Sequence, residues 1–140
     1  MSEGSGERSG NLPSPVGPYS IFREMDGWVF LSGQIGLDPS TGAIVAGGVE
    51  AEARQVLMNV ESILSAAGLD WSCCIKTTLF LVEMSDFPVV NDIYSERVPM
   101  PYPARSTIGV RELPKGARIE LEIVARRPGP FTGPGSVKSD

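Results

Sequence analysis

Residues 103–125, PARSTIGVRELPKGARIELEIVA, contain two predicted strands on either side of a turn at Leu113-Pro114-Lys115-Gly116. Charged and apolar residues alternate from position 118 to 122, which is the pattern of a strand with one apolar face. The two strands carry Arg105 and Glu120. A guanidinium can bind a carboxylate through two parallel N–H donors, and a glutamate can hold and polarise a water molecule. We therefore predict that Arg105 and Glu120 bind and hydrolyse a small acid.

Three further elements are predicted in the first half of the chain. Residues 19–25 and 28–35 are predicted strands, joined through Asp26-Gly27, which is a strong hairpin signal. Apolar residues then recur at helical spacing over residues 49–67. Gly68 follows this stretch, where a glycine commonly ends a helix.

The middle of the chain adds one strand and one helix. Residues 75–82 are apolar at both odd and even positions, which indicates a strand covered on both faces. A second helix is predicted to begin near Ser85-Asp86, with Pro88 in its first turn. The side chains that this helix is expected to bury are Phe87, Val90, Tyr94 and Val98.

The order strand, strand, helix, strand, helix, strand, strand predicts an α+β fold, with both helices packed on one face of a single mixed sheet. Several strands have apolar residues at both odd and even positions, so both faces of the sheet are apolar. One short chain has no further element to bury the face opposite the helices. We therefore predict a homo-oligomer packed through the open sheet faces, with ligand sites in the grooves between subunits.

The chain has 140 residues, which is enough for one compact domain with a sizeable core. We assign this domain to residues 13–127. Residues 1–12 and 128–140 lack periodicity and are dense in Gly, Pro and Ser, so we predict flexible tails at both ends.

Composition excludes several classes of function. The net charge is −5 and the pI is about 4.8, so nucleic acid is an improbable partner. The chain has no His, which excludes Ser-His-Asp and Cys-His catalysis and His-based zinc sites. Its only cysteines, Cys73 and Cys74, are adjacent, which is poor geometry for a disulfide and too few ligands for a structural zinc.

The sequence also predicts where in the cell the protein is located. No apolar run approaches the roughly 20 residues that a membrane-spanning helix needs, and we expect no membrane association. The first residues are polar and glycine-rich, unlike a secretory signal or a transit peptide. We therefore expect a cytoplasmic protein with reduced thiols.

Beyond single residues, an ordered series of short motifs runs from Gly17 to Ala125 and covers nearly the whole predicted domain. The motifs are Gly17-Pro18-Tyr19-Ser20, Ser32-Gly33-Gln34-Ile35-Gly36, Asp38-Pro39, Thr41-Gly42, Asn59, Ala66-Ala67-Gly68, Lys76-Thr77-Thr78, Asp86-Phe87 with Asn91 and Tyr94, Pro103-Ala104-Arg105-Ser106, Leu113-Pro114-Lys115-Gly116-Ala117 and Ile119-Glu120-Leu121-Glu122. Together they resemble the Rid (YjgF) family of enamine/imine deaminases, also known as the endoribonuclease L-PSP family. The resemblance implies a fold like that of the Bacillus chorismate mutase, a homotrimer, and three sites in the clefts between subunits.

The resemblance also implies a reaction, that of a 2-iminobutanoate/2-iminopropanoate deaminase. Such an enzyme hydrolyses 2-aminoacrylate, 2-aminocrotonate and their imine forms to 2-keto acids and ammonia, without a cofactor. By resemblance, Arg105 binds the substrate carboxylate and Glu120 positions the attacking water. The residues that would line the pocket are Tyr19, Ser32, Gly33, Asn91 and Thr107, with Tyr19 and Asn91 from the neighbouring subunit.

Alternative interpretations remain open from the sequence. Arg105 could neutralise Glu120 or Glu122 across the hairpin. Period two places Glu120 and Glu122 on one face of their strand, and only the family position selects Glu120. Ile21 and residues 95–100 depart from the family pattern, which leaves the substrate range open. Two other functions compete with deamination: an endoribonuclease or translation inhibitor, and a non-catalytic protein that binds small acids or acts as a chaperone.

Overall fold

The structure is a computed structural model that describes residues 12, 14–15 and 17–129. The main elements are β1 (Phe22–Met25), β2 (Trp28–Gln34), α2 (Gly48–Ala66), β3 (Cys74–Leu81), α3 (Phe87–Arg97), β4 (Ala104–Gly109) and β5 (Ile119–Arg126). Single 3₁₀ turns lie at η2 (Trp71–Cys73), η3 (Met84–Asp86) and η4 (Pro114–Gly116). The predicted order of strands and helices is therefore confirmed, and the ends of the first three strands and of the first helix lie within three residues of their expected places.

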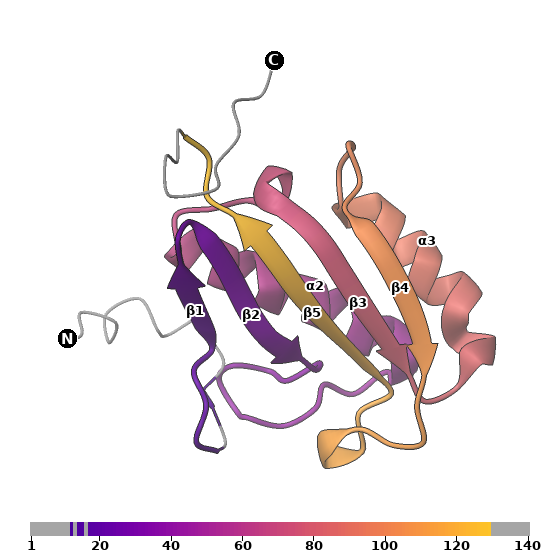
Figure 1. Ribbon diagram of the computed structural model, residues 1–140. Coiled ribbons are helices and arrows are strands. Elements are labelled where there is room, and N and C mark those ends of the chain that lie inside the picture. Colours follow the sequence, from indigo (N-terminus) through magenta and orange to yellow (C-terminus); the bar gives the residue numbers. More distant parts are fainter. Residues whose placement is uncertain (1–11, 13, 16, 130–140) are drawn as a thin grey trace.

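The strands form one five-stranded mixed sheet in the order β1-β2-β5-β3-β4. Strands β3 and β4 are parallel, because α3 carries the chain back between them, and the other neighbouring pairs are antiparallel. Figure 1 shows α2 and α3 behind the sheet, and no other described helix or strand lies in front of it. The predicted α+β architecture, with both helices on one face, is confirmed.

Local sequence explains the turns that connect these elements. Asp26 and Gly27 form the β1–β2 turn with φ of 55° and 84°, the left-handed values that a tight hairpin requires. Gly68 has φ of 78° after the last turn of α2, as predicted for a residue that ends a helix.

The core lies between the sheet and the two helices. The apolar stripe of α2 is buried against side chains from the middle strands, and α2 also contacts α3. The largest fully buried side chains are Ile63, Leu64, Leu79, Leu81, Ile93, Leu121 and Ile123. This packing makes the sheet a rigid support for side chains at its edges.

No helix among the described residues covers the opposite face of the sheet, as predicted. Phe30 is 52% exposed and Trp28 is 39% exposed, although Val29 between them is buried on the helix side. Ile108 of β4 shares this face with Phe80 of β3, its neighbour in the ladder, and is 42% exposed. The apolar open face supports the prediction that copies of this chain associate.

The predicted tails fall almost entirely outside the described residues, apart from Leu12 and positions 128–129. Within the described residues, no helix is long and apolar enough to cross a membrane.

Candidate functional site

Arg105 lies on the edge strand β4 and points toward the helix side of the sheet. It pairs in register with Thr77 of β3, which is fully buried under α3. The guanidinium carbon lies 4.7 Å from the ring centroid of Tyr94 and 5.3 Å from that of Phe87. Both distances are those of cation–π contacts.

Three side chains that face Arg105 come from one side of α3. Phe87, Asn91 and Tyr94 occupy positions i, i+4 and i+7, which fall on a single helix face. The phenol oxygen of Tyr94 and Oγ1 of Thr77 are hydrogen-bonded at 2.9 Å. Burial is the main cause that raises the pKa of Tyr94, so this hydroxyl stays neutral.

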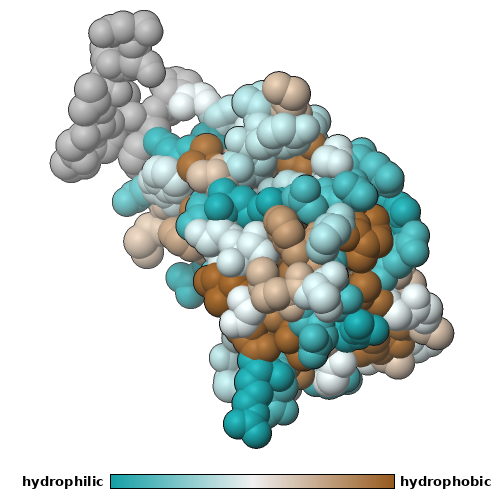
Figure 2. All heavy atoms as spheres, turned by 90° about the vertical axis from the view of Figure 1, so that its right-hand side faces the viewer, coloured by the Kyte–Doolittle hydropathy of each residue, from teal (hydrophilic) through white to brown (hydrophobic). Residues whose placement is uncertain are grey.

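The Arg105 guanidinium forms no ion pair or hydrogen bond with any described residue, and it lies against the two rings. By contrast, four other arginines have carboxylate partners: Arg54, Arg97, Arg118 and Arg127. The guanidinium of Arg105 opens into a pocket of about 400 Å³, which we call the arginine pocket. Its lining residues are Asn91, Tyr94, Ser95, Tyr102, Pro103 and Arg105. Figure 2 shows this edge of the molecule, where hydrophobic and hydrophilic surface are interspersed.

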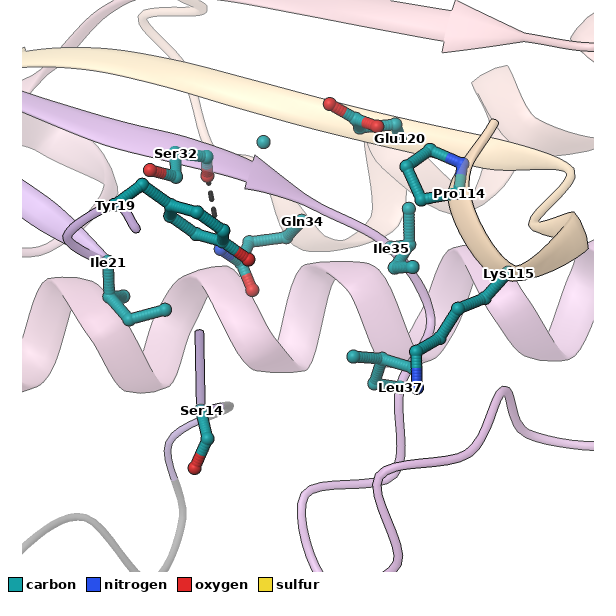
Figure 3. Close-up of a pocket in the computed structure, with 11 residues that line it drawn as sticks. Ser14, Tyr19, Ile21, Ser32, Gln34, Ile35, Leu37, Pro114, Lys115 and Glu120 are labelled. Carbon is teal, nitrogen blue, oxygen red and sulfur yellow. Dashed lines mark hydrogen bonds between the residues drawn. The ribbon is translucent and has the colours of Figure 1, made fainter. Parts of the chain in front are cut away.

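Glu120 lies in a different pocket, of about 360 Å³, which we call the glutamate pocket. Its lining residues are Ser14, Tyr19, Ile21, Ser32, Gly33, Gln34, Ile35, Leu37, Pro114, Lys115 and Glu120. Figure 3 shows Glu120 beside Pro114, with the ring of Tyr19 and the side chain of Lys115 on the other sides of this space.

The irregular end of β2 shapes the glutamate pocket. The pairing of β2 with β5 shifts between Leu31 and Gln34. This shift places Gly33 against Glu120, where a Cβ on Gly33 would lie 2.0 Å from Oε2 of the carboxylate. Ser32 donates a 2.6 Å hydrogen bond from Oγ to the carbonyl of Ser20, which holds the segment that carries Tyr19 against β2. Gly33 is therefore needed here because its missing side chain leaves space for the carboxylate.

The Glu120 carboxyl has a raised pKa. Burial is the larger cause, and the negative charge of Glu122, two residues along the same strand face, is the second. No described cation forms an ion pair with the Glu120 carboxylate. Lys115, which lines the same pocket, instead donates a hydrogen bond from Nζ to the carbonyl of Gly42 at 3.2 Å. A carboxyl whose pKa is raised is a better general base near neutral pH than an ordinary one.

The two charged residues face opposite sides of the sheet. Arg105 pairs with Thr77 and Glu120 pairs with Phe80, three positions further along β3. Since strand side chains alternate, an odd offset places them on opposite faces. The alternative that Arg105 neutralises Glu120 or Glu122 is therefore wrong, and so is the expectation that Arg105 and Glu120 of one chain act together.

The predicted pocket residues divide between the two pockets. Tyr19, Ser32 and Gly33 line the glutamate pocket, whereas Asn91 lines the arginine pocket. The expected grouping of Tyr19 with Asn91 on one subunit, opposite Arg105 and Glu120, is therefore not the one observed. Thr107 shares the strand face of Arg105 but lines neither pocket.

Sequence reasoning missed part of each pocket. It named Tyr94 and Phe87 as buried side chains of the helix and as part of a family motif but gave them no role in a site, although their spacing with Asn91 indicates one shared face. It also gave no role to Ile21, Gln34 and Lys115, which line the glutamate pocket. Their inclusion depends on the β2 irregularity and on the turn before β5, which no periodic pattern reports.

The cysteines and acidic residues offer little other chemistry. Both cysteines are free, and burial raises the pKa of Cys74 to about 12, so its thiol stays protonated. Among the described residues, no group of three or more metal-ligating side chains of the His, Cys, Asp and Glu types comes together.

Comparison with known proteins agrees with the fold. The family model described as endoribonuclease L-PSP matches residues 9–127. A human protein named 2-iminobutanoate/2-iminopropanoate deaminase is 48% identical over 120 residues, which cover 86% of this chain and 87% of that protein. A crystal structure of a putative endoribonuclease from Thermotoga maritima superimposes with a TM-score of 0.82 at 38% identity, covering 86% of this chain and 94% of the other. The crystal structure of Escherichia coli TdcF with bound serine has a TM-score of 0.78 at 37% identity, and 85% of this chain and 95% of the other are covered.

Proposed function

This chain belongs to the endoribonuclease L-PSP family, also called the Rid (YjgF) family, and we propose that it is a deaminase that hydrolyses small 2-imino acids. The products would be 2-keto acids and ammonia, and the substrates would include the imine forms of 2-aminoacrylate and 2-aminocrotonate. Relatives at 42–48% identity that cover most of this chain carry the name 2-iminobutanoate/2-iminopropanoate deaminase.

The observation that carries the proposal is the state of Arg105. This guanidinium opens into a pocket, and among the described residues it has no carboxylate partner and no partner for its N–H donors. An arginine in this state is suited to bidentate binding of a substrate carboxylate. Asn91, in the same pocket, can donate a further hydrogen bond.

Glu120 supplies the base in the proposed reaction. A water held by its carboxylate would attack the carbon of the protonated imine, while the carboxylate takes one of the water protons. The resulting neutral carbinolamine carries both a hydroxyl and an NH2 group on one carbon. The proton on Glu120 would then pass to the nitrogen, and the C–N bond would break with release of ammonia as the hydroxyl proton moves to the Glu120 carboxylate and the keto group forms. Loss of that last proton, which leaves with ammonia as ammonium, restores the carboxylate. The imine is already electrophilic, so correct positioning of substrate and water is the main requirement, and no cofactor is needed.

A substrate that touches Arg105 and Glu120 would have to lie between two copies of the chain, because the two residues face opposite sides of one sheet. We propose that the open faces associate into a homotrimer, which brings the arginine pocket of one copy against the glutamate pocket of the next. The exposed Phe30, Trp28 and Ile108 would then be covered. A cytoplasmic location stays a prediction.

The test is release of ammonia and keto acid from 2-aminoacrylate, generated in place by a serine dehydratase, with the rate in buffer alone subtracted. Wild type should accelerate the release, and Arg105→Ala should abolish the acceleration while the protein remains folded. The exposed Arg111, which lines neither pocket, provides the control, and Arg111→Ala should retain full activity. If wild type binds 2-oxobutanoate yet leaves the rate unchanged, the protein is a non-catalytic binder of small acids instead.

A further inference from the structure

The arginine pocket contains an interaction that the proposed reaction does not use directly, namely the aromatic surface beneath Arg105. We propose that Tyr94, together with Phe87, is a positioning residue that holds the Arg105 guanidinium in the orientation that receives a carboxylate. This inference rests on the proposed function, because it assigns a role within the same site. It differs from carboxylate binding itself, since neither ring needs to touch the substrate.

The two rings contact the guanidinium without using its N–H donors. A carboxylate partner would hold Arg105 through its N–H donors, the groups that a substrate needs. An aromatic ring attracts the cation through its π face and leaves those donors available. With ring centroids at 4.7 Å and 5.3 Å from the guanidinium carbon, Arg105 is held without losing its ability to bind an anion.

The Tyr94 ring is itself held in place by its surroundings. Tyr94 is 6% exposed, and its hydroxyl is hydrogen-bonded at 2.9 Å to Thr77, which is 0% exposed. Thr77 is also the residue of β3 that pairs with Arg105 in register. The ring is therefore fixed at one end by α3 and at the other by the strand next to Arg105.

Holding the guanidinium in advance should increase the affinity of the site for a carboxylate. A free arginine side chain loses much rotamer freedom when it binds a ligand, and that loss weakens binding. A guanidinium already held against two rings loses less, so the site is preorganised for the carboxylate. The expected consequence is an effect on affinity for the carboxylate and little effect on the later chemical step.

The variants that test this assignment separate the ring from its hydroxyl. Tyr94→Leu removes the ring, whereas Tyr94→Phe keeps the ring and removes only the hydrogen bond to Thr77. Trp71→Phe is the matched control, because Trp71 is buried, donates its Nε1 hydrogen bond to Glu61 at 2.8 Å, and lies outside both pockets. Thermal melting and light scattering check that each variant is folded and assembled like wild type.

The readouts are KM and kcat for the imine generated in place, and the Kd of 2-oxobutanoate by calorimetry. Tyr94→Leu should raise KM and Kd about tenfold, the effect of one desolvated cation–π contact, with kcat within about twofold of wild type. Tyr94→Phe should raise both by no more than about threefold, since the ring remains. Trp71→Phe should lower the melting temperature without changing either constant.

A neutral analogue identifies the group that the ring helps to bind. The preference for 2-oxobutanoate over 2-oxobutanamide should fall about tenfold in Tyr94→Leu and stay unchanged in Trp71→Phe. A purely structural role for Tyr94 would lower stability without changing that preference. If Tyr94→Leu does not fold, Phe87→Leu replaces it, with an expected rise in Kd of about threefold for the more distant ring.

The outcomes distinguish the two proposals. A Kd within about twofold of wild type in folded Tyr94→Leu overturns the positioning role, even if wild type proves to be a deaminase. A rise in Kd without any turnover by wild type supports the positioning role and refutes the deaminase. If wild type neither binds 2-oxobutanoate nor hydrolyses the imine, both proposals are wrong.

Discussion

The two pockets hold their charged groups in opposite ways. In the arginine pocket, a cation lies against aromatic rings and no carboxylate pairs with it among the described residues. In the glutamate pocket, a half-buried carboxylate has a second carboxylate nearby, and burial together with this neighbour raises its pKa. Each pocket therefore contains a charge whose natural complement is missing from its own surroundings.

This difference indicates that the two pockets have separate roles in binding and catalysis. The arginine pocket is prepared to bind a negative group, and the glutamate pocket is prepared to accept a proton. In one chain the two face opposite sides of the sheet. A ligand that uses both must therefore be enclosed by two copies, and experiments that change one pocket at a time can test this division.

The largest expected effect comes from mixing two inactive variants. Arg105→Ala and Glu120→Gln should each lose nearly all activity, because each removes the charged group of one pocket. If the site lies between copies, unfolding and refolding the two variants together restores roughly one complete site in four in a trimer. The measurement is the rate of keto-acid release from the refolded mixture compared with each variant refolded alone.

The control for mixing is to combine the finished proteins without unfolding them, which should restore nothing unless subunits exchange. A refolded mixture as inactive as its components would contradict a site shared between copies. Activity in either variant alone would instead contradict the role assigned to its missing residue.

Gly33→Ala should give the next largest effect. The added Cβ would lie 2.0 Å from the Glu120 carboxylate, so the carboxylate has to move. The moving group is the end of a flexible side chain and Gly33 does not need a positive φ, so the fold should tolerate the change. We expect kcat to fall by about tenfold or more, since misplaced catalytic groups are costly, with little change in melting temperature.

A double-mutant cycle provides the check on this interpretation. In a Glu120→Gln background, which already lacks the base, Gly33→Ala should cost no further activity. An equal loss in both backgrounds would mean that Gly33 matters for some reason other than the space that it leaves for Glu120.

Sequence reasoning predicted the fold well because its evidence was local. The Asp26-Gly27 hairpin, the apolar periodicity of α2 and the end of that helix at Gly68 are each determined by neighbouring residues. The apolar open face of the sheet was also predicted, from apolar residues at both odd and even strand positions. The exposed side chains of Phe30 and Ile108 on this face confirm it.

The site was less predictable because it depends on register between distant strands. The sequence shows which residues of β4 share a face and which residues of β5 share a face. It does not show which residue of β3 lies opposite a given residue of β4 or β5, and this register decides whether Arg105 and Glu120 share a face. The opposite facing of Arg105 and Glu120 was therefore missed. The irregularity between Leu31 and Gln34 was only partly predictable, because a glycine inside a strand, as in Ser32-Gly33, can mark a bend but does not give the register on either side of it.

The dependence of activity on pH tests the raised pKa of Glu120. Activity requires the ionised carboxylate, so it should fall as the pH decreases through a value above the ordinary 4.5 of a glutamate. Glu122→Gln removes the second cause of the shift and should move this acid limb to lower pH, while burial keeps the pKa of Glu120 raised. The measurement is kcat/KM against pH, with exposed Glu112→Gln as the control. A limb that does not move would show that Glu122 has no influence on the base.

The smallest expected effect is on stability, and it has the opposite sign to the effect on activity. Since folding raises the pKa of Glu120, folding favours its protonated form, and the ionised form at neutral pH destabilises the folded state. Glu120→Gln should therefore raise the melting temperature by about 1–3 °C near pH 7.5. The gain should shrink as the pH falls, because the wild-type carboxyl becomes protonated, and it should vanish below the ordinary carboxyl pKa near 4.5. The same change in Glu112, which is exposed, should give no difference that depends on pH. A lower melting temperature for Glu120→Gln at neutral pH would mean that the glutamate pocket stabilises its carboxylate, and the contrast between the two pockets would then be wrong.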